Sequence, residues 1–145
     1  MNAIQSKEYG IALLRISLGV MFIAHSVVLK LFTYGLAGTA GYFESIGLPA
    51  ALAYIVFGME AVGGILLVLG VRTREVSAAL IPVLAGALWV HAGNGWVFSN
   101  AGGGWEYPLY LIVLSAAQAL LGEGAFALGK SKAGTERLVG QRSAA

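Results

Sequence analysis

Apolar residues run along this chain in four long stretches, separated by shorter segments in which glycine and polar residues gather. The stretches cover about residues 10–31, 48–71, 76–93 and 107–128. A helix needs about 20 mostly apolar residues to cross the hydrocarbon layer of a bilayer. The stretches show no period-two alternation, and they exceed the roughly 10 residues of a barrel strand. The pattern therefore predicts an all-α fold, an integral membrane four-helix bundle with one spanning helix for each stretch.

The segments between and after the stretches predict how the chain is divided. Residues 32–47 are rich in glycine and predict either a loop or a short helix that lies in the membrane interface. Residues 94–107 combine turn-forming residues with two tryptophans, which prefer the headgroup layer. We expect a cytoplasmic N-terminal segment at 1–9, a four-helix domain at 10–128 and a basic, disordered cytoplasmic tail at 129–145.

Composition also indicates a membrane protein. Hydrophobic residues make up 58% of the 145 and charged residues 11%, whereas a soluble domain carries about a quarter charged residues. A chain this short has too much surface to leave so few charges facing water, so part of its surface must face lipid. The net charge of +2 is too small to indicate a nucleic-acid partner. The lack of cysteine excludes disulfides, thiol redox chemistry and thiolate metal ligands.

Lysine and arginine in the short connections predict the orientation. The connection between the second and third stretches holds Arg72 and Arg74, the N-terminal segment holds Lys7, and the C-terminal tail is basic. Cytoplasmic loops carry an excess of such residues, so we expect a multi-pass protein of the inner (plasma) membrane with both termini inside. A cleaved signal peptide is the alternative for the first stretch. Its apolar run is longer than the usual 7–15 residues or so, which favours a spanning helix.

Two ionisable residues inside the predicted spans form the first candidate site. Arg15 lies about 8 Å and Glu60 about 16 Å from the cytoplasmic ends of their helices. An arginine side chain can bridge that difference, so the sequence predicts an intramembrane Arg15–Glu60 pair. Such a pair serves either as a structural clasp between helices or as a charged contact at a substrate pocket. Charge-pair energetics do not separate these two roles.

A second group of polar residues is expected toward the outer face. His25 and His91 lie at nearly equal depth, and Lys30, Asn94 and Glu106 come close to the outer ends of their helices. We expect these five residues to form an outward-facing polar cluster, with the histidines as proton acceptors. Two histidines at one depth also allow haem ligation, or a metal with Glu106 as third ligand. A hydrated cluster with neither haem nor metal is the favoured interpretation.

Glycines follow Glu60 on the same face of its helix. Gly63 and Gly64 come three and four residues after it. Small residues let helices approach closely in lipid, where no hydrophobic force drives helix association. The sequence therefore predicts Gly63 and Gly64 as helix-packing positions, with Glu60 directed into the bundle.

Together these residues resemble a known family. The strings RISLGVMFIAHSVVLKLF and GLPAALAYIVFGMEAVGGILLVLGVRTR are similar to the DoxX family of small four-helix inner-membrane proteins. The resemblance covers roughly residues 8–128 and implies the four-helix fold. It also implies, from some relatives, an association with quinone-linked thiosulfate oxidation or with membrane-bound redox assemblies. The residues that carry it are Arg15, Gly19, Lys30, Glu60, Gly63, Gly64, Gly70, His91, Trp96 and Glu106.

The resemblance and the polar residues predict a membrane subunit or accessory of a redox assembly, with a protein partner in the bilayer. No cofactor is evident, and a quinone or a small sulfur compound is the candidate ligand, with Arg15 and Glu60 setting the polarity of its pocket. The sequence holds no nucleotide loop, Ser-His-Asp set or metal-spaced motif, so a subunit of an oxidoreductase is expected rather than an isolated enzyme. A non-catalytic membrane scaffold and a small-solute transporter are the alternatives. The lack of a visible internal repeat counts against the transporter.

Overall fold

The computed structural model describes residues 2–129, which form five α-helices and no strand. The first helix continues into a π-helical stretch at Ala24–Thr33, and a 3-10 turn at Ala92–Asn94 extends the fourth. The prediction of an all-helical fold is confirmed. The helices are α1 (Ala3–Ile23), α2 (Leu36–Ser45), α3 (Ala50–Leu69), α4 (Thr73–His91) and α5 (Glu106–Leu121).

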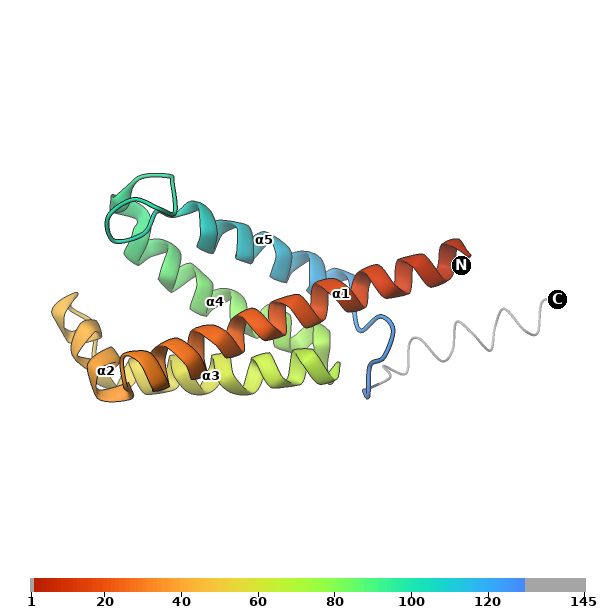
Figure 1. Cartoon of the computed structure of the whole chain (residues 1–145), viewed down its shortest axis with the longest axis horizontal. Helices are drawn as coiled ribbons and strands as arrows, with labels where there is room; N and C mark the ends of the chain where they lie inside the picture. The colour runs from red at the N-terminus through yellow and green to blue at the C-terminus, as the bar shows by residue number, and fades with distance from the viewer. Residues whose placement is uncertain (1, 130–145) are drawn as a thin grey trace.

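The helices α1, α3, α4 and α5 run along one another, and α2 lies at one end of the bundle (Figure 1). α1 pairs mainly with α3, α4 pairs mainly with α5, and α2 packs against α3. The two ends of the bundle differ in composition. The end with α2 and the loop at residues 95–105 is called the loop end below. The opposite end, called the arginine end, holds Arg15, Arg72, Arg74 and residues 122–129.

The surface and length of the helices indicate a membrane protein. Three helical stretches are long and apolar enough to cross a bilayer, namely Ala3–Thr33, Ala50–Leu69 and Thr73–Asn94. α5 is also apolar, but its 16 residues rise only about 24 Å against a hydrocarbon layer of about 30 Å. Large apolar side chains are exposed on the outside of the bundle, among them Leu13, Val20, Ile55, Val62 and Val113.

The fourth apolar stretch does not form one helix, so the prediction of a helix to residue 128 was wrong beyond Leu121. Gly122 and Gly124 adopt backbone conformations with positive φ, at 93° and 69°. A helix requires negative φ, and glycine is the residue that leaves it at the lowest cost. The glycines between the apolar residues therefore end α5 early.

Residues 122–129, named the return segment here, cross the arginine end of the bundle. The Ala125 N–H donates to the Glu8 carbonyl oxygen of α1 at 3.0 Å. The Leu128 N–H donates to the Leu69 carbonyl oxygen at the end of α3, also at 3.0 Å. Backbone hydrogen bonds to both helices thus fix the return segment between α1 and α3.

Glycine sets the separation of α1 from α3. A Cβ atom on Gly19 would lie 2.7 Å from the Gly64 carbonyl oxygen, and one on Gly64 would lie 2.8 Å from the Gly19 oxygen. A Cβ atom on Gly63 would lie 3.0 Å from the Leu80 side chain of α4. Glu60 is buried on this same face of α3. Close backbone approach through small residues is a common means of packing helices in lipid.

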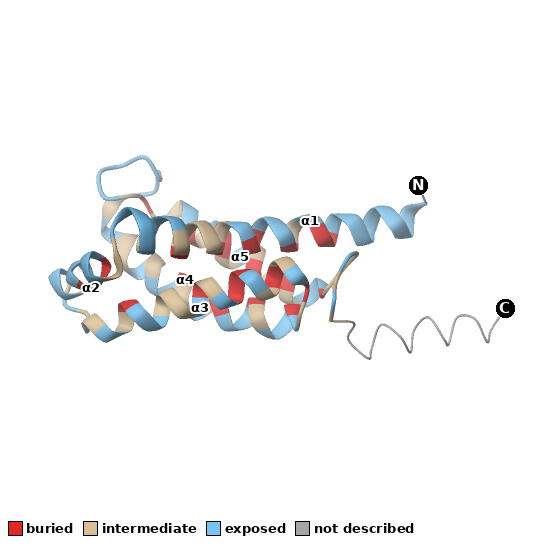
Figure 2. Ribbon diagram, turned by 60° about the horizontal axis from the view of Figure 1, so that its bottom comes forward, coloured by how far each residue is buried: buried red, intermediate tan, exposed pale blue. Residues whose placement is uncertain are grey.

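Small polar side chains on α4 and α5 are buried as well. Thr73 and Ser77 of α4 and Ser115 and Gln118 of α5 are almost completely inaccessible. Figure 2 shows that buried residues lie on the inward sides of the helices, whereas the first turns of α1 are exposed and project beyond the bundle. Polar side chains thus lie in the interior together with the apolar core, as expected where polar groups avoid hydrocarbon.

The close approach of α1 to α3 makes Gly64→Ala destabilising. The added methyl group has no room beside the Gly19 carbonyl, so the free energy of unfolding should fall by about 1–3 kcal/mol. The measurement is reversible unfolding in mixed micelles of rising dodecyl sulfate content. Gly58→Ala on the same helix is the matched control, because a Cβ atom there meets nothing within 4 Å. Equal stability of the two variants would show that the close approach of α1 to α3 does not limit the size of residue 64.

Candidate functional site

Arg15 is fully buried and donates to three backbone carbonyl groups at the arginine end. Its Nη1 donates to the Leu67 and Val68 oxygens of α3 at 2.7 and 2.8 Å, and its Nη2 donates to the Ala125 oxygen of the return segment at 2.9 Å. The last carbonyls of a helix have no partners within it and carry partial negative charge. Arg15 therefore caps α3 and holds the return segment against it.

Gly70 provides the space for this cap. It ends α3 with a φ of 69°, and its N–H donates to the Leu67 oxygen while the Val71 N–H donates to the Leu66 oxygen. This pair of bonds is the usual way in which a left-handed glycine satisfies the end of a helix. A Cβ atom at Gly70 would lie 2.6 Å from Nη1 of Arg15. Gly70 is thus required both for its backbone conformation and for the room it leaves.

Arg74 caps the other helix that ends here. Its Nη1 donates to the Ala119 and Leu120 oxygens of α5 at 3.1 and 2.8 Å, and its Nη2 donates to the Leu121 oxygen at 3.4 Å. The sequence indicated Arg74 only as a charge that sets orientation. Two arginines thus satisfy the ends of two helices on the same side of the bundle.

Glu60 pairs with Lys30 rather than with Arg15, which corrects the expected Arg15–Glu60 pair. The Nζ atom of Lys30 lies 2.6 Å from Oε2 of Glu60, and the two side chains are 18% and 9% exposed. The crossing of α1 and α3 places Arg15 beside Leu67, about 10 Å along α3 from Glu60. Backbone carbonyls lie within reach of the guanidinium there, and the carboxylate does not.

The local structure around Lys30 is unusual. Lys30 belongs to the π-helical stretch Ala24–Thr33, and π turns in α-helices occur frequently at functional sites. Its carbonyl oxygen accepts from Oγ1 of Thr39 in α2, at 3.3 Å. An ion pair away from water is stable only while both charges are present, because either one alone is poorly solvated. The pair thus joins the end of the first span to the middle of α3.

His25 and His91 line one pocket at the loop end, although they lie far apart in the sequence. The pocket has a volume of about 530 Å³, and its other walls are Phe98, Gly103, Gly104, Tyr107 and Pro108. The rings of His25 and Tyr107 are stacked, with their centroids 5.8 Å apart. The π-helical stretch, α4, α5 and the loop between them therefore meet at this site.

Backbone contacts fix how each histidine holds its proton. Nδ1 of His25 lies 3.0 Å from the Met21 carbonyl oxygen, and Nδ1 of His91 lies 2.9 Å from the Gly102 carbonyl oxygen. A carbonyl only accepts, so Nδ1 carries the hydrogen in both rings. In the neutral rings Nε2 then has a lone pair free to take up a proton. The backbone thus occupies Nδ1 in both histidines, and Nε2 is the ring nitrogen that remains for a ligand.

Asn94 and Glu106 hold the loop, and they do not line that pocket. Nδ2 of Asn94 donates to the Gly102 and Gly103 carbonyl oxygens at 3.0 and 2.9 Å. Oε1 of Glu106 accepts from the Phe98 N–H at 2.8 Å. The five residues expected in one outer cluster thus separate into two that line the pocket, two that hold its loop, and Lys30, which pairs with Glu60.

Phe98, Tyr107 and Pro108 line the pocket with side chains that sequence reasoning did not select as site residues, and two of them are aromatic. The aromatic residues Phe98 and Tyr107 belong to the segment 94–107, which was interpreted as lying in the membrane interface. The position of Tyr107 directly after Glu106 at the start of an apolar stretch was the available signal. Within residues 2–129, no group of three or more His, Cys, Asp or Glu side chains is placed to hold a metal ion.

Comparison with known proteins agrees with this architecture. The family model DoxX matches residues 10–93, more than half of the chain. The chain belongs to the DoxX family. The matched range includes Arg15, His25, Lys30, Glu60 and His91, whereas α5 lies beyond it.

Two curated proteins are similar to this DoxX protein over most of their length. "Putative oxidoreductase CatD" of Bacillus subtilis is 35% identical over 124 residues, which cover 86% of this chain and 87% of that protein. An uncharacterized protein of Haemophilus influenzae is 34% identical over 129 residues, which cover 88% of this chain and 93% of that protein. No solved structure gives a significant match.

Arg15→Lys should destabilise this DoxX protein even though the charge is kept. A single ammonium group cannot reproduce the planar fork that reaches α3 and the return segment together, so the free energy of unfolding should fall by about 2 kcal/mol or more. Dodecyl sulfate unfolding measures the loss. Arg72→Lys, at an exposed position of the same end, is the control and should change little. A stable Arg15→Lys variant would argue against the capping role.

Lys30 and Glu60 should show strong coupling in a double-mutant cycle. Glu60→Gln leaves the ammonium group of Lys30 buried and unpaired, and Lys30→Met leaves the carboxylate of Glu60 buried and unpaired. Each change should lower the free energy of unfolding by about 2–4 kcal/mol. The double variant should lose much less than the sum of the two single losses. Additive losses in unfolding experiments would show that the two charges do not depend on each other.

Proposed function

We propose that this DoxX protein is a membrane subunit of a redox assembly and that the pocket of His25, His91 and Tyr107 binds a quinone. The observation that carries the proposal is the pocket itself, in which two histidines that hold Nδ1 against backbone carbonyls share the lining with the aromatic rings of Phe98 and Tyr107. A quinone needs both features, because its ring and tail are apolar and its two oxygens exchange protons on reduction. The name of the CatD relative, which contains the word oxidoreductase, also supports redox chemistry.

The proposal includes four crossings of the plasma membrane, with both termini in the cytoplasm. Three stretches have the length of a span, and we assign the fourth crossing to the shorter apolar helix α5. Arg72 and Arg74 lie at the arginine end, where α1 also begins, and an excess of such residues favours the cytoplasmic side. The histidine pocket at the loop end then belongs to the outer half of the bundle.

Proton transfer in the pocket follows from the fixed tautomers. The neutral ring of His25 or His91 accepts a hydrogen bond from a quinol hydroxyl through Nε2 and takes its proton as the quinol is oxidised. The protonated ring donates to a quinone carbonyl in the reverse direction. Tyr107 keeps the His25 ring in position by stacking against it.

Electrons require a partner. Oxidation of a quinol to a quinone releases two protons and two electrons, and the histidines handle only the protons. The sequence contains no cysteine, so thiol chemistry within the chain does not carry the electrons. We assign them to a flavin- or haem-carrying protein in the same membrane. In this assignment Arg15 stabilises the fold, and the Lys30–Glu60 pair keeps charge inside the bundle.

Quinone binding tests the proposal directly. The protein in lipid nanodiscs is titrated with a decyl-substituted benzoquinone, and the quenching of tryptophan fluorescence gives the Kd. His25→Asn and His91→Asn should each raise the Kd about tenfold, a loss of about 1.4 kcal/mol, because the asparagine amide still reaches the backbone carbonyl but Nε2 is gone.

Glu123→Gln, at the other end of the bundle, is the control and should bind like the parent chain. Circular dichroism checks that each variant keeps its helices. If both histidine variants fold and bind the quinone as the parent does, the pocket is not a quinone site. The scaffold and transporter alternatives would then take precedence.

A further inference from the structure

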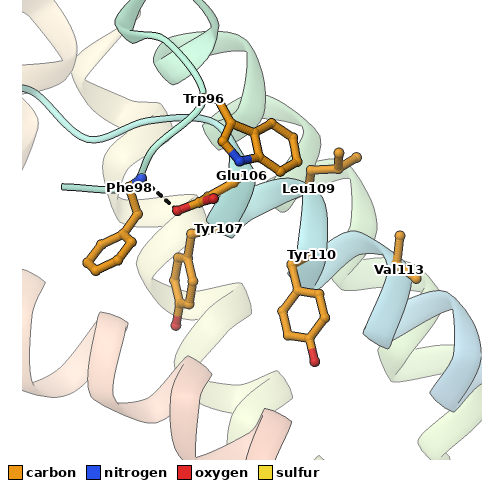
Figure 3. A pocket seen from close by; sticks show the side chains of 7 residues that line it. All are labelled: Trp96, Phe98, Glu106, Tyr107, Leu109, Tyr110 and Val113. Atoms are coloured by element: carbon orange, nitrogen blue, oxygen red, sulfur yellow. Dashed lines mark hydrogen bonds between the residues drawn. The ribbon is translucent and has the colours of Figure 1, made fainter. Parts of the chain in front are cut away.

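A second cavity opens along α5, next to the histidine pocket (Figure 3). Its volume is about 390 Å³. The two cavities share Phe98 and Tyr107, which stand between them as a common wall. We name the second cavity the aromatic groove and define it by Trp96, Phe98, Glu106, Tyr107, Tyr110 and Val113.

The aromatic groove has a polar end and an apolar end. Glu106, Tyr110 and Val113 follow one another along a single face of α5, at spacings of four and three residues. The rise from Glu106 to Val113 is about 10 Å. In Figure 3 the carboxylate lies beside the loop, the rings of Tyr107 and Tyr110 extend from the helix, and Val113 lies farther along it. An elongated ligand with one polar head matches this shape.

Glu106 supplies a negative charge that no basic side chain neutralises within residues 2–129. Its Oε1 accepts from the Phe98 N–H at 2.8 Å, which orients the carboxylate. The ion pair between Lys30 and Glu60 is the one that the described residues contain. A carboxylate at the mouth of an apolar cavity attracts a cation, because few other groups there compensate its charge.

Four aromatic rings strengthen the preference for a cation. Trp96, Phe98, Tyr107 and Tyr110 all line the groove. The faces of such rings attract ammonium groups, and combinations of rings with a carboxylate recognise quaternary ammonium ligands. We propose that the aromatic groove binds a lipophilic monocation, an amine or quaternary ammonium that carries an apolar chain. The ammonium group lies beside Glu106, and the chain follows α5 toward Val113.

The same charges argue against other occupants. An anionic amphiphile is repelled by Glu106, and a quinone is uncharged and makes no use of it. A zwitterionic phospholipid brings a phosphate group, for which the lining of the groove offers no lysine or arginine. The monocation is therefore the occupant that matches every part of the lining. This proposal does not depend on the quinone proposal, because neither the charge nor the ligand is shared.

Titration with dodecyltrimethylammonium tests the inference. The full chain is held in dodecyl maltoside micelles and carries Trp89→Phe, so that fluorescence reports on Trp96 and Trp105, whose rings lie 4.5 Å apart. Saturable binding is expected, and Glu106→Gln should weaken it at least about threefold. Glutamine keeps an oxygen that accepts from the Phe98 N–H, so the loop stays in place while the charge is lost.

Two comparisons make the result decisive. Tyr110→Leu removes a ring and leaves the carboxylate, and it should weaken binding about twofold or more. Glu44→Gln removes a charge from the exposed surface of α2 and should leave binding unchanged. Dodecanol, with the same apolar chain and no charge, should give no saturable signal. Equal affinity of Glu106→Gln and the parent, or equal binding of dodecanol, overturns the proposal.

Discussion

The guanidinium group of Arg15 connects three parts of the chain, and the arrangement of the bundle depends on its position. It lies on α1 and donates to the end of α3 and to the return segment, so it fixes the register between them. Each hydrogen bond from a charged donor contributes about 1.5–3 kcal/mol, whereas a buried guanidinium without partners is costly. The group is therefore stable in one arrangement of α1 against α3.

The register set at the arginine end decides which residues meet at the loop end. With Gly19 against Gly64, the π-helical stretch brings Lys30 to Glu60 and His25 to the ring of Tyr107. The polar side chains that the sequence predicted in one cluster therefore have separate partners. Two adjacent cavities result, one with proton-accepting histidines and one with a carboxylate among aromatic rings.

Hydropathy predicted the helices well because lipid requires every backbone group to be paired within its own helix. Hydropathy did not predict the end of α5, because glycine occurs both in spanning helices and in turns. The positive φ angles of Gly122 and Gly124, which end the helix, are seen only in the structure. Counting residues placed His25 and His91 at one level, and both line one pocket. The depth estimate gave the wrong partner for Arg15. It considered only carboxylates as partners of an arginine and left out the unpaired carbonyl groups at the end of a helix.

The early end of α5 has a consequence for the surrounding bilayer. The first helical stretch contains 31 residues and α5 contains 16, a difference of roughly 20 Å in rise. The first turns of α1 project beyond the bundle, so the excess length of the first stretch sets no mismatch, whereas α5 rises only about 24 Å against a hydrocarbon layer of about 30 Å. Under the proposed four crossings, the lipids beside α5 must thin, and a thin bilayer accommodates this helix at lower cost than a thick one.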